Sequence, residues 1–145
     1  MMATTGLERR PAMSCLTTEV CLELLRAEDL GRIGFASQKG IEILPVGYRA
    51  AAGPRLFISA QPWGIVGQLA EADAECTFEV DHHDRTGMSG WSVLMQGVLS
   101  RLDRAGADAY ANLDHSLEAW PGYPHTRPVQ FLPRSITGRS VLRPS

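Results

Sequence analysis

The chain has few cysteines and no long apolar run, and each shortage excludes a class of protein. Its three cysteines, Cys15, Cys21 and Cys76, form no Cys-x-x-Cys pair. An odd number of cysteines without such spacing predicts structural thiols in a reducing cytoplasm. No apolar stretch has the length of a membrane span, and none follows Arg9 and Arg10 as an export signal requires. We therefore expect a cytoplasmic protein that is stabilised by its core.

Nucleotide-binding signatures are also missing. The sequence has no G-x-G-x-x-G and no G-x-x-x-x-G-K-[ST]. A net charge of −2 gives no general attraction for nucleic acid or a membrane surface. With 145 residues, 44% hydrophobic and 21% charged, the composition is that of one globular domain. We expect a flexible tail over residues 1–14 and a single domain over residues 15–145, with neither nucleic acid nor membrane as partner.

Charge is unevenly distributed along the chain. Acidic residues gather between residues 71 and 84, whereas the last twenty residues contain no acid and four arginines, namely Arg127, Arg134, Arg139 and Arg143. One interpretation is two solvated faces. The other is that C-terminal arginines bind an anionic ligand, since a guanidinium can grip a phosphate with two hydrogen bonds.

The first third of the chain predicts a helix followed by a β-hairpin. Thr17 is suited to cap a helix that begins at Leu16, and Gly31 is expected to end it. Alternating apolar residues then predict strands over 32–37 and 41–49, joined by a short turn. Pro45 must lie at a sheet edge or a bulge, because proline cannot donate to a ladder.

The rest of the chain continues with strands and a few helices. Strands are expected at 56–58, 76–80, 89–102, 129–132 and 136–142, helices at 65–72 and 105–120, and loops at 81–87 and 121–124. Strands joined by hairpins, with only peripheral helices, favour a mainly β, antiparallel barrel over a doubly wound sheet.

Several residues bear groups that are common in catalytic or metal sites. His82, His83 and Asp84 stand together, but adjacent histidines in a loop point apart, so a solvated turn is favoured over a metal site. Ser89 lacks the glycine two places later that a nucleophile elbow requires, because Trp91 stands there. We therefore predict no metal, and no catalytic residue is assigned.

Three other side chains have competing interpretations. His115, beside Asp114, is a possible base but falls on an expected helix face, where exposed histidines are common. Cys76 has no cation near it in sequence that would lower its pKa, so a buried inert thiol is favoured. Trp91 is either a core tryptophan or the flat wall of a ligand site, in which Ser92 would donate to a phosphate or carbonyl.

Six short motifs occur in a characteristic order. They are Gly-Arg-Ile-Gly-Phe at 31–35, Leu-Pro-Val-Gly-Tyr at 44–48, Leu-Phe-Ile-Ser-Ala at 56–60, Phe-Glu-Val-Asp at 78–81, Gly-Trp-Ser-Val-Leu at 90–94 and Ile-Thr-Gly-Arg at 136–139. Together they resemble the pyridoxamine 5′-phosphate oxidase-like, FMN-binding split barrels, in the group that includes nitroimidazole-resistance proteins. The resemblance covers nearly the whole chain, from Leu16 to Leu142.

The resemblance implies a six-stranded antiparallel split barrel that forms a homodimer, with FMN in a groove between the subunits. The flavin would supply hydride or electron transfer. The positions that it assigns to the cofactor are Val46, Gly47, Tyr48, Ser59, Ala60, Ile65, Val66, Trp91 and Ser92.

The chain departs from the family pattern at three polar or cationic positions. Where relatives have Gly-Ser-Lys, this chain has Gly64, Ile65 and Val66, so a valine replaces the lysine expected to bind phosphate. Gly47 replaces an asparagine, and Gln96 replaces a basic residue. Losing one charge-assisted hydrogen bond weakens binding by about tenfold or more. Compensating cations would have to come from arginines elsewhere, namely Arg32, Arg49, Arg85 or Arg139.

The resemblance and its departures leave two functional hypotheses. The first is an FMN- or deazaflavin-dependent oxidoreductase acting on a small molecule. The second is a split barrel that has lost FMN and binds another small ligand, or catalyses a non-redox step in specialised metabolism, with Trp63, Trp91 and Tyr48 as walls. A binding dimer without catalytic activity is a third reading.

Overall fold

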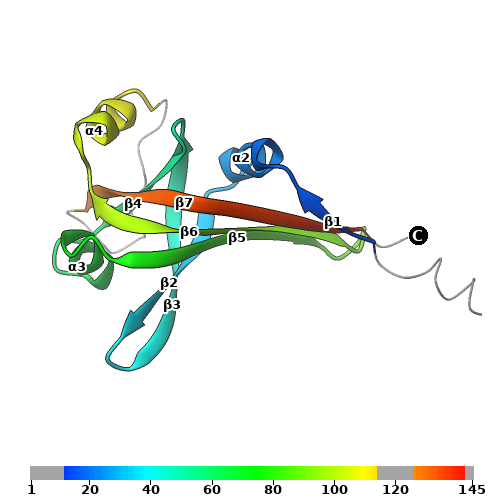
Figure 1. Ribbon diagram of the computed structural model, residues 1–145, viewed down its shortest axis with the longest axis horizontal. Helices are drawn as coiled ribbons and strands as arrows, with labels where there is room; N and C mark the ends of the chain where they lie inside the picture. Colours follow the sequence, from blue (N-terminus) through cyan, green and yellow to red (C-terminus); the bar gives the residue numbers. More distant parts are fainter. Residues whose placement is uncertain (1–11, 114–125, 143–145) are drawn as a thin grey trace, which may run out of the picture.

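Seven strands and three helices make up the part of the chain that the computed structural model describes, which is residues 12–113 and 126–142. In chain order they are β1 (Ala12–Leu16), α2 (Thr18–Ala27), β2 (Leu30–Ser37), β3 (Gly40–Ala51), β4 (Arg55–Ala60), α3 (Ile65–Glu71), β5 (Glu75–Asp84), β6 (Ser89–Arg101), α4 (Arg104–Ala111) and β7 (Arg127–Leu142). The strands follow the order β1-β7-β4-β3-β2-β5-β6 in one antiparallel sheet, and β6 also pairs with β7. Strands β2 to β7 therefore close into the six-stranded split barrel that the family resemblance implies (Figure 1).

The β2–β3 hairpin extends from the barrel as a two-stranded ribbon (Figure 1). Gly40 closes the turn with a φ of +115°, a conformation that glycine adopts without steric cost. Pro45 pairs with Arg32 of β2 and is exposed, and β4 pairs with β3 only from Tyr48 onward. The prediction that Pro45 lies at a sheet edge is therefore confirmed.

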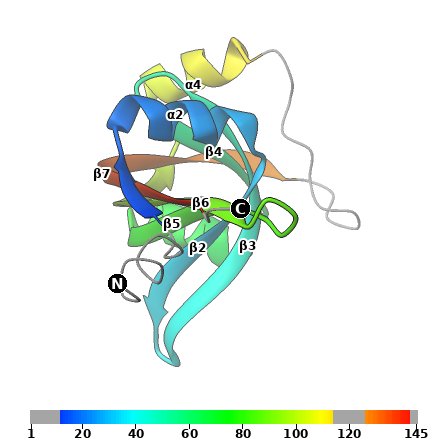
Figure 2. The same ribbon diagram turned by 90° about the vertical axis from the view of Figure 1, so that its right-hand side faces the viewer.

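Helix α2 lies across one end of the barrel, as both ribbon views show (Figure 2). Its N-cap is Thr17, whose hydroxyl accepts a hydrogen bond from the Val20 amide at 3.2 Å, as predicted. Gly138 of β7 lies directly beneath Cys21, because a Cβ at this glycine would collide with the Cys21 sulfur. The helix ends at Ala27 rather than Gly31, since β2 begins at Leu30 and pairs with β3.

Three further element boundaries differ from the sequence prediction. Strand β1 was not expected: residues 12–14, assigned to the tail, pair with β7, and residues 1–11 lie outside the described residues. Strand β5 continues through Asp84, because its ladder with β6 includes the polar stretch that was predicted as a loop. The two predicted C-terminal strands are one strand, because Pro133 lies at a register shift opposite Gly97.

The second amphipathic helix is shorter than predicted. It ends at Ala111, with Asn112 as its C-cap, rather than continuing to Trp120. The remainder of that predicted helix, from residue 114, and the predicted loop at 121–124 lie outside the described residues. Within the described ranges, no helix combines the length and the apolar composition that crossing a membrane requires.

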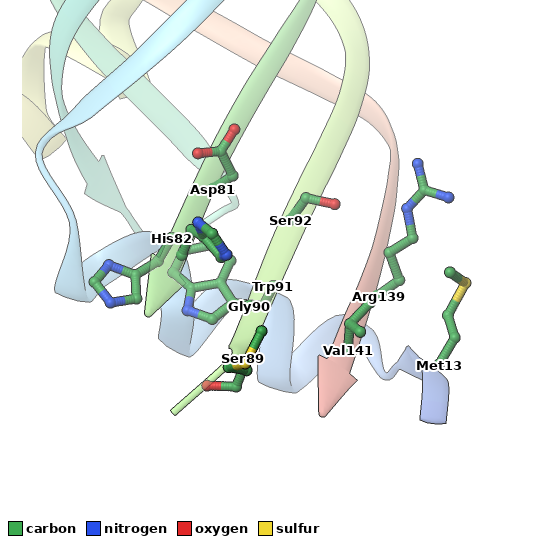
Figure 3. Close-up of a pocket in the computed structure, with 11 residues that line it drawn as sticks. Met13, Asp81, His82, Ser89, Gly90, Trp91, Ser92, Arg139 and Val141 are labelled. Carbon is green, nitrogen blue, oxygen red and sulfur yellow. The ribbon is translucent and has the colours of Figure 1, made fainter. Parts of the chain in front are cut away.

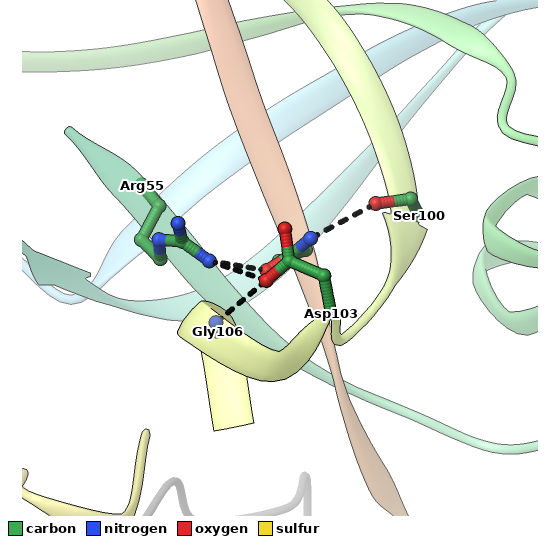
Figure 4. A network of polar contacts seen from close by, with 5 residues as sticks. Arg55, Ser100, Asp103 and Gly106 are labelled. Carbon is green, nitrogen blue, oxygen red and sulfur yellow. Dashed lines mark hydrogen bonds and ion pairs between the residues drawn. The ribbon is translucent and has the colours of Figure 1, made fainter. Parts of the chain in front are cut away.

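A polar network around the buried side chain of Gln130 fixes α4 to the barrel (Figure 4). Gln130 of β7 is only 1% exposed, and its carbonyl oxygen accepts a hydrogen bond from the Arg55 guanidinium at 2.7 Å. The same guanidinium bonds Asp103 at 3.0 Å, and Asp103 caps α4 by accepting from the Gly106 amide at 2.6 Å. The Gln130 amide donates to Ser100 at 3.2 Å. Every side chain of the network therefore has a partner, as a buried polar cluster requires.

Candidate functional site

The barrel opens where β3 and β4 separate. The two strands pair from Tyr48–Ile58 to Ala51–Arg55, while the preceding part of β3 pairs with β2 alone. A cavity of about 200 Å³ occupies this position and is closed at one end by the start of α3. We call it the β3–β4 groove, and its walls are Leu44, Pro45, Val46, Gly47, Ser59, Ala60, Gln61, Gly64, Ile65, Val66 and Thr126.

Six of the nine residues assigned to the cofactor lie together in this groove: Val46, Gly47, Ser59, Ala60, Ile65 and Val66. The sequence did not identify the other five lining residues. Four of these lie within two residues of predicted ones in the chain, so only wider boundaries were needed. Thr126 is distant in sequence and reaches the groove because it precedes β7, which pairs with β4.

The groove suits a flat, largely apolar ring with polar edges. Its side walls are mostly aliphatic, with Ser59, Gln61 and Thr126 as polar side chains. Among the described residues, the edge of β3 that faces away from β2 has no partner strand before Tyr48, so its backbone groups there are available to a ligand. No lysine or arginine is among the described lining residues. The described part of the groove therefore offers apolar contact and a few hydrogen-bonding groups but no cation.

Tyr48 lies in the core instead of the groove. Its ring is 1% exposed and packs edge-on against Phe78, with centroids 5.5 Å apart. Its hydroxyl donates to the Leu25 carbonyl at 2.7 Å, and its amide donates to the Asp29 carbonyl at 2.9 Å. Burial raises the pKa of the phenol well above its usual value. The side chain is therefore neither a groove wall nor a group that exchanges protons near neutral pH.

Trp91 and Ser92 line a different, larger cavity of about 680 Å³ at the far ends of β5, β6 and β7 (Figure 3). We call it the β5–β7 cavity, and its walls are Met13, Asp81, His82, His83, Met88, Ser89, Gly90, Trp91, Ser92, Arg139 and Val141. Trp91 also packs against the core cluster, on the same strand face as buried Val93. Its ring lies 6.4 Å from that of His82, at 24° between the planes. The geometry favours the core interpretation for the indole.

An acid pair lies on β5 beside that cavity. One nitrogen of Arg32 lies 3.1 Å from a Glu79 carboxylate oxygen and 2.9 Å from an Asp81 oxygen. The pKa of Glu79 is raised to about 7, mainly because the carboxyl group is partly buried. The hydrogen bond to Asp81 and the negative charge of Asp81 also contribute to this rise. The hydrogen bond from Glu79, with help from Arg32, lowers the pKa of Asp81. The environment therefore favours a protonated Glu79 beside an ionised Asp81.

The remaining residues that the sequence singled out form no catalytic or metal constellation among the described residues. His82 and His83 lie in β5 rather than a loop, and the described part of the chain holds no cluster of three or more metal-ligating side chains. Cys76 is buried, which raises the pKa of its thiol and fits an inert residue. His115 and Asp114 lie outside the described residues.

The side chains proposed as extra walls or cations also lie elsewhere. Trp63 is 65% exposed and does not line the groove. None of the four arginines considered as replacements for the phosphate lysine lines it either, namely Arg32, Arg49, Arg85 and Arg139. Arg139 instead lines the β5–β7 cavity.

The fold and the open edge of β3 define a split barrel with a ligand groove, and comparison with known proteins agrees. Residues 17–140 match the family model for pyridoxamine 5′-phosphate oxidase. The chain therefore belongs to the pyridoxamine 5′-phosphate oxidase family. A comparison with curated proteins gave no match.

Solved structures of similar fold include flavin-binding proteins. An FAD-binding protein from Mycobacterium smegmatis is 26% identical, with a TM-score of 0.74 over 91% of this chain and 100% of the other. An FAD-binding protein from Mesorhizobium loti is 21% identical, with a TM-score of 0.71 over 91% and 98% of the two chains. A candidate 5-nitroimidazole resistance protein from Bacteroides thetaiotaomicron is 11% identical, with a TM-score of 0.66 over 91% and 89%. The last two likenesses concern the fold alone.

Proposed function

We propose that the protein binds a flavin with its ring in the β3–β4 groove and acts as an oxidoreductase on a small molecule. The observation that carries the proposal is the separation of β3 from β4, which leaves a backbone edge facing an apolar cavity. Family membership and the FAD-binding protein from M. smegmatis support it. FMN and FAD carry the same isoalloxazine ring, and a deazaflavin carries a tricyclic ring of the same shape. The groove alone therefore does not choose among them.

In this proposal the chain's own residues orient the ring rather than react with it. Val46, Ala60 and Val66 provide apolar contact, and Ser59 and Gln61 offer hydrogen bonds at the ring edge. A bound flavin supplies hydride or electron transfer. The residues of the groove would exclude water from one side of the ring.

We propose further that two chains together complete the site, as a cytoplasmic homodimer. The groove's volume of about 200 Å³ lies below the range of about 300–1,000 Å³ that complete small-molecule sites occupy. A phosphate is also bound most strongly by a cation, and no lysine or arginine is among the described lining residues. A second chain would supply both the missing wall and the missing cation. The three free cysteines fit a reducing compartment.

The test is a titration of the full-length protein with FMN and FAD, repeated on a variant whose groove is blocked. Ser59→Phe places a ring in the groove. Ser135→Phe makes the same change at an exposed position of β7 outside it. We expect wild type and Ser135→Phe to bind flavin and to be reduced anaerobically by a nicotinamide nucleotide, and Ser59→Phe to bind at least tenfold more weakly. Equal binding by all three proteins would contradict the assignment of the groove.

One observation favours a second candidate function. The absence of a cation among the described groove residues, with Val66 at the position of the expected lysine, suits an uncharged apolar ligand better than a phosphate ester. In that case the protein would bind no flavin, and a neutral ring compound would protect it against thermal unfolding.

A further inference from the structure

Arg127 is the first residue of β7, and it stands directly across from a wall of the β3–β4 groove. Strand pairing places Arg127 opposite Ala60, which is 5% exposed and lines the groove. Directly opposed residues of an antiparallel pair project to the same face, with Cβ atoms about 4.5–5.5 Å apart. The preceding residue, Thr126, is itself a wall. Arg127 therefore lies at the edge of the groove, although it is not among the described walls.

The position of Arg127 along β7 places its side chain where the core ends. Val129 and Phe131 follow it at alternate positions of the strand, share its face and are buried, whereas Arg127 is exposed. Helix α3, which closes one end of the groove, lies at the same end of the barrel and contacts β7 (Figure 1). An arginine stem can follow apolar surface while its charged head stays in water. The guanidinium can therefore lie beside the groove without losing its hydration.

No acidic group neutralises this arginine within the part of the chain that the structure describes. Arg127 makes no ion pair there, whereas four other arginines do, namely Arg32, Arg55, Arg101 and Arg134. The acid of the neighbouring helix α3, Glu71, lies 3.7 Å from the Arg101 guanidinium. None of the described walls of the groove is acidic. The positive charge of Arg127 is therefore available to a ligand.

We propose that Arg127 makes the β3–β4 groove a site for a ligand with an anionic group, either a phosphate or a carboxylate. The inference rests on the proposed function in that it places the ligand in this groove. A guanidinium binds such groups with two parallel, charge-assisted hydrogen bonds. Arg127 then supplies a charge that Val66 cannot supply. Because a phosphate carries nearly two negative charges, a cation from a second chain would add to Arg127 rather than replace it.

The anionic group can come from the flavin or from the small-molecule substrate, and two pairs of probes distinguish these sources. FMN is compared with riboflavin, which has the same ring without the phosphate, by fluorescence titration of the full-length protein. Benzoate is compared with benzyl alcohol, added to the flavin-loaded protein and followed by backbone amide signals in NMR. We expect the charged member of at least one pair to bind about tenfold more tightly than its neutral counterpart.

Three variants test whether this preference comes from Arg127. Arg127→Gln should weaken binding of the charged member to the level of the neutral one and leave the neutral one within about twofold of wild type. Arg127→Lys should keep part of the preference, because lysine keeps the charge but loses the two-pronged geometry. Arg85→Gln removes an exposed arginine between β5 and β6, at the other end of the sheet, and should bind as wild type does. Circular dichroism verifies that each variant is folded.

The outcomes separate this inference from the proposed function. If flavins bind but wild type shows no preference for either charged probe, or Arg127→Gln keeps the preference, the proposed function stands and the inference is wrong. Equal weakening of charged and neutral probes by Arg127→Gln would mark the residue as structural and would also overturn it. If no flavin binds, the proposed function fails, and benzoate and benzyl alcohol are compared on the flavin-free protein. Benzoate binding that depends on Arg127 would then support an anion site, and its absence would overturn the inference.

Discussion

The hydroxyl of Tyr48 donates a hydrogen bond of 2.7 Å to the carbonyl of Leu25, and this contact joins the barrel to the last turn of α2. Both residues are almost completely buried, so water is not available as a replacement partner. A tyrosine that the family resemblance assigns to the ligand is therefore used by this chain to fix a helix.

Tyr48→Phe should destabilise the protein without affecting the ligand groove. The change leaves the Leu25 carbonyl without its partner in a buried position, which costs about 1–3 kcal/mol of unfolding free energy. Urea denaturation measures this loss, and flavin affinity should stay within about twofold of wild type because the ring is outside the groove. Tyr110→Phe is the control: the described residues give its hydroxyl no hydrogen-bond partner, so the loss should be below about 0.5 kcal/mol. Tenfold weaker flavin binding by Tyr48→Phe would place Tyr48 back at the ligand.

Gly106→Ala should disrupt the network that holds α4. The new methyl group would collide with the Gln130 side-chain oxygen and would lie 2.7 Å from the Arg55 guanidinium. Because Gln130 is buried and its oxygen accepts the Arg55 hydrogen bond, we expect a loss of about 2 kcal/mol or more. Ala105→Ser, at the exposed preceding position, should cost less than about 0.5 kcal/mol. Equal thermal stability of the two variants would show that the network can rearrange at little cost.

The Glu79–Asp81 pair predicts how stability depends on pH. Burial raises the pKa of Glu79 from 4.5 to about 7, so the folded state holds a proton that the unfolded chain releases. The contribution of Glu79 to stability is therefore fully present below pH 4.5 and is lost as pH rises to about 7. The lowered pKa of Asp81 acts in the opposite direction, but only at more acidic pH.

Glu79→Gln removes the titrating group and tests this expectation. Urea unfolding at several pH values between 5 and 7.5 should show a smaller decline in stability for the variant than for wild type. Glu42→Gln, on the distant β3 strand, serves as the control and should follow the wild-type profile. Identical profiles for wild type and Glu79→Gln would mean that Glu79 titrates near its ordinary pKa.

Val66→Lys should strengthen binding of a phosphorylated flavin. The resemblance places a phosphate-binding lysine at this position, and Val66 lines the groove at the start of α3. One charge-assisted hydrogen bond gained corresponds to about tenfold tighter binding of FMN. Gln68→Lys adds the same charge to the same helix outside the groove and should change affinity less than about twofold. If both variants bind alike, the phosphate does not lie near α3.

Local sequence signals predicted most elements of this fold, and pairing between distant segments decided the rest. Thr17, Gly40 and Pro45 each impose a constraint on their own neighbourhood, and the structure follows all three. Strand β1 and the polar end of β5 carry no such signal, because they are strands only through their ladders with β7 and β6. Neither ladder can be seen in the sequence of one segment.

In the candidate site, too, local motifs predicted some residues, and pairing between distant segments decided where the others lie. Val46 and Ser59 lie in motifs of adjacent strands, and both line the β3–β4 groove. Trp91 and Ser92 belong to another cavity, because the start of β6 pairs with the end of β7 and with the end of β5. The direction of each side chain then depends on strand alternation, which placed the Trp91 indole on the core and left Ser92 facing outward.

The proposed function depends most directly on whether the β3–β4 groove holds a flavin. The decisive measurement is a fluorescence titration of FMN and FAD with the purified full-length protein, together with mass spectrometry of any cofactor released from it on denaturation. We expect a released flavin, or saturable quenching at micromolar concentration of at least one of the two. A colourless protein that quenches neither flavin at high micromolar concentration would contradict the account and would favour a groove adapted to an uncharged ligand.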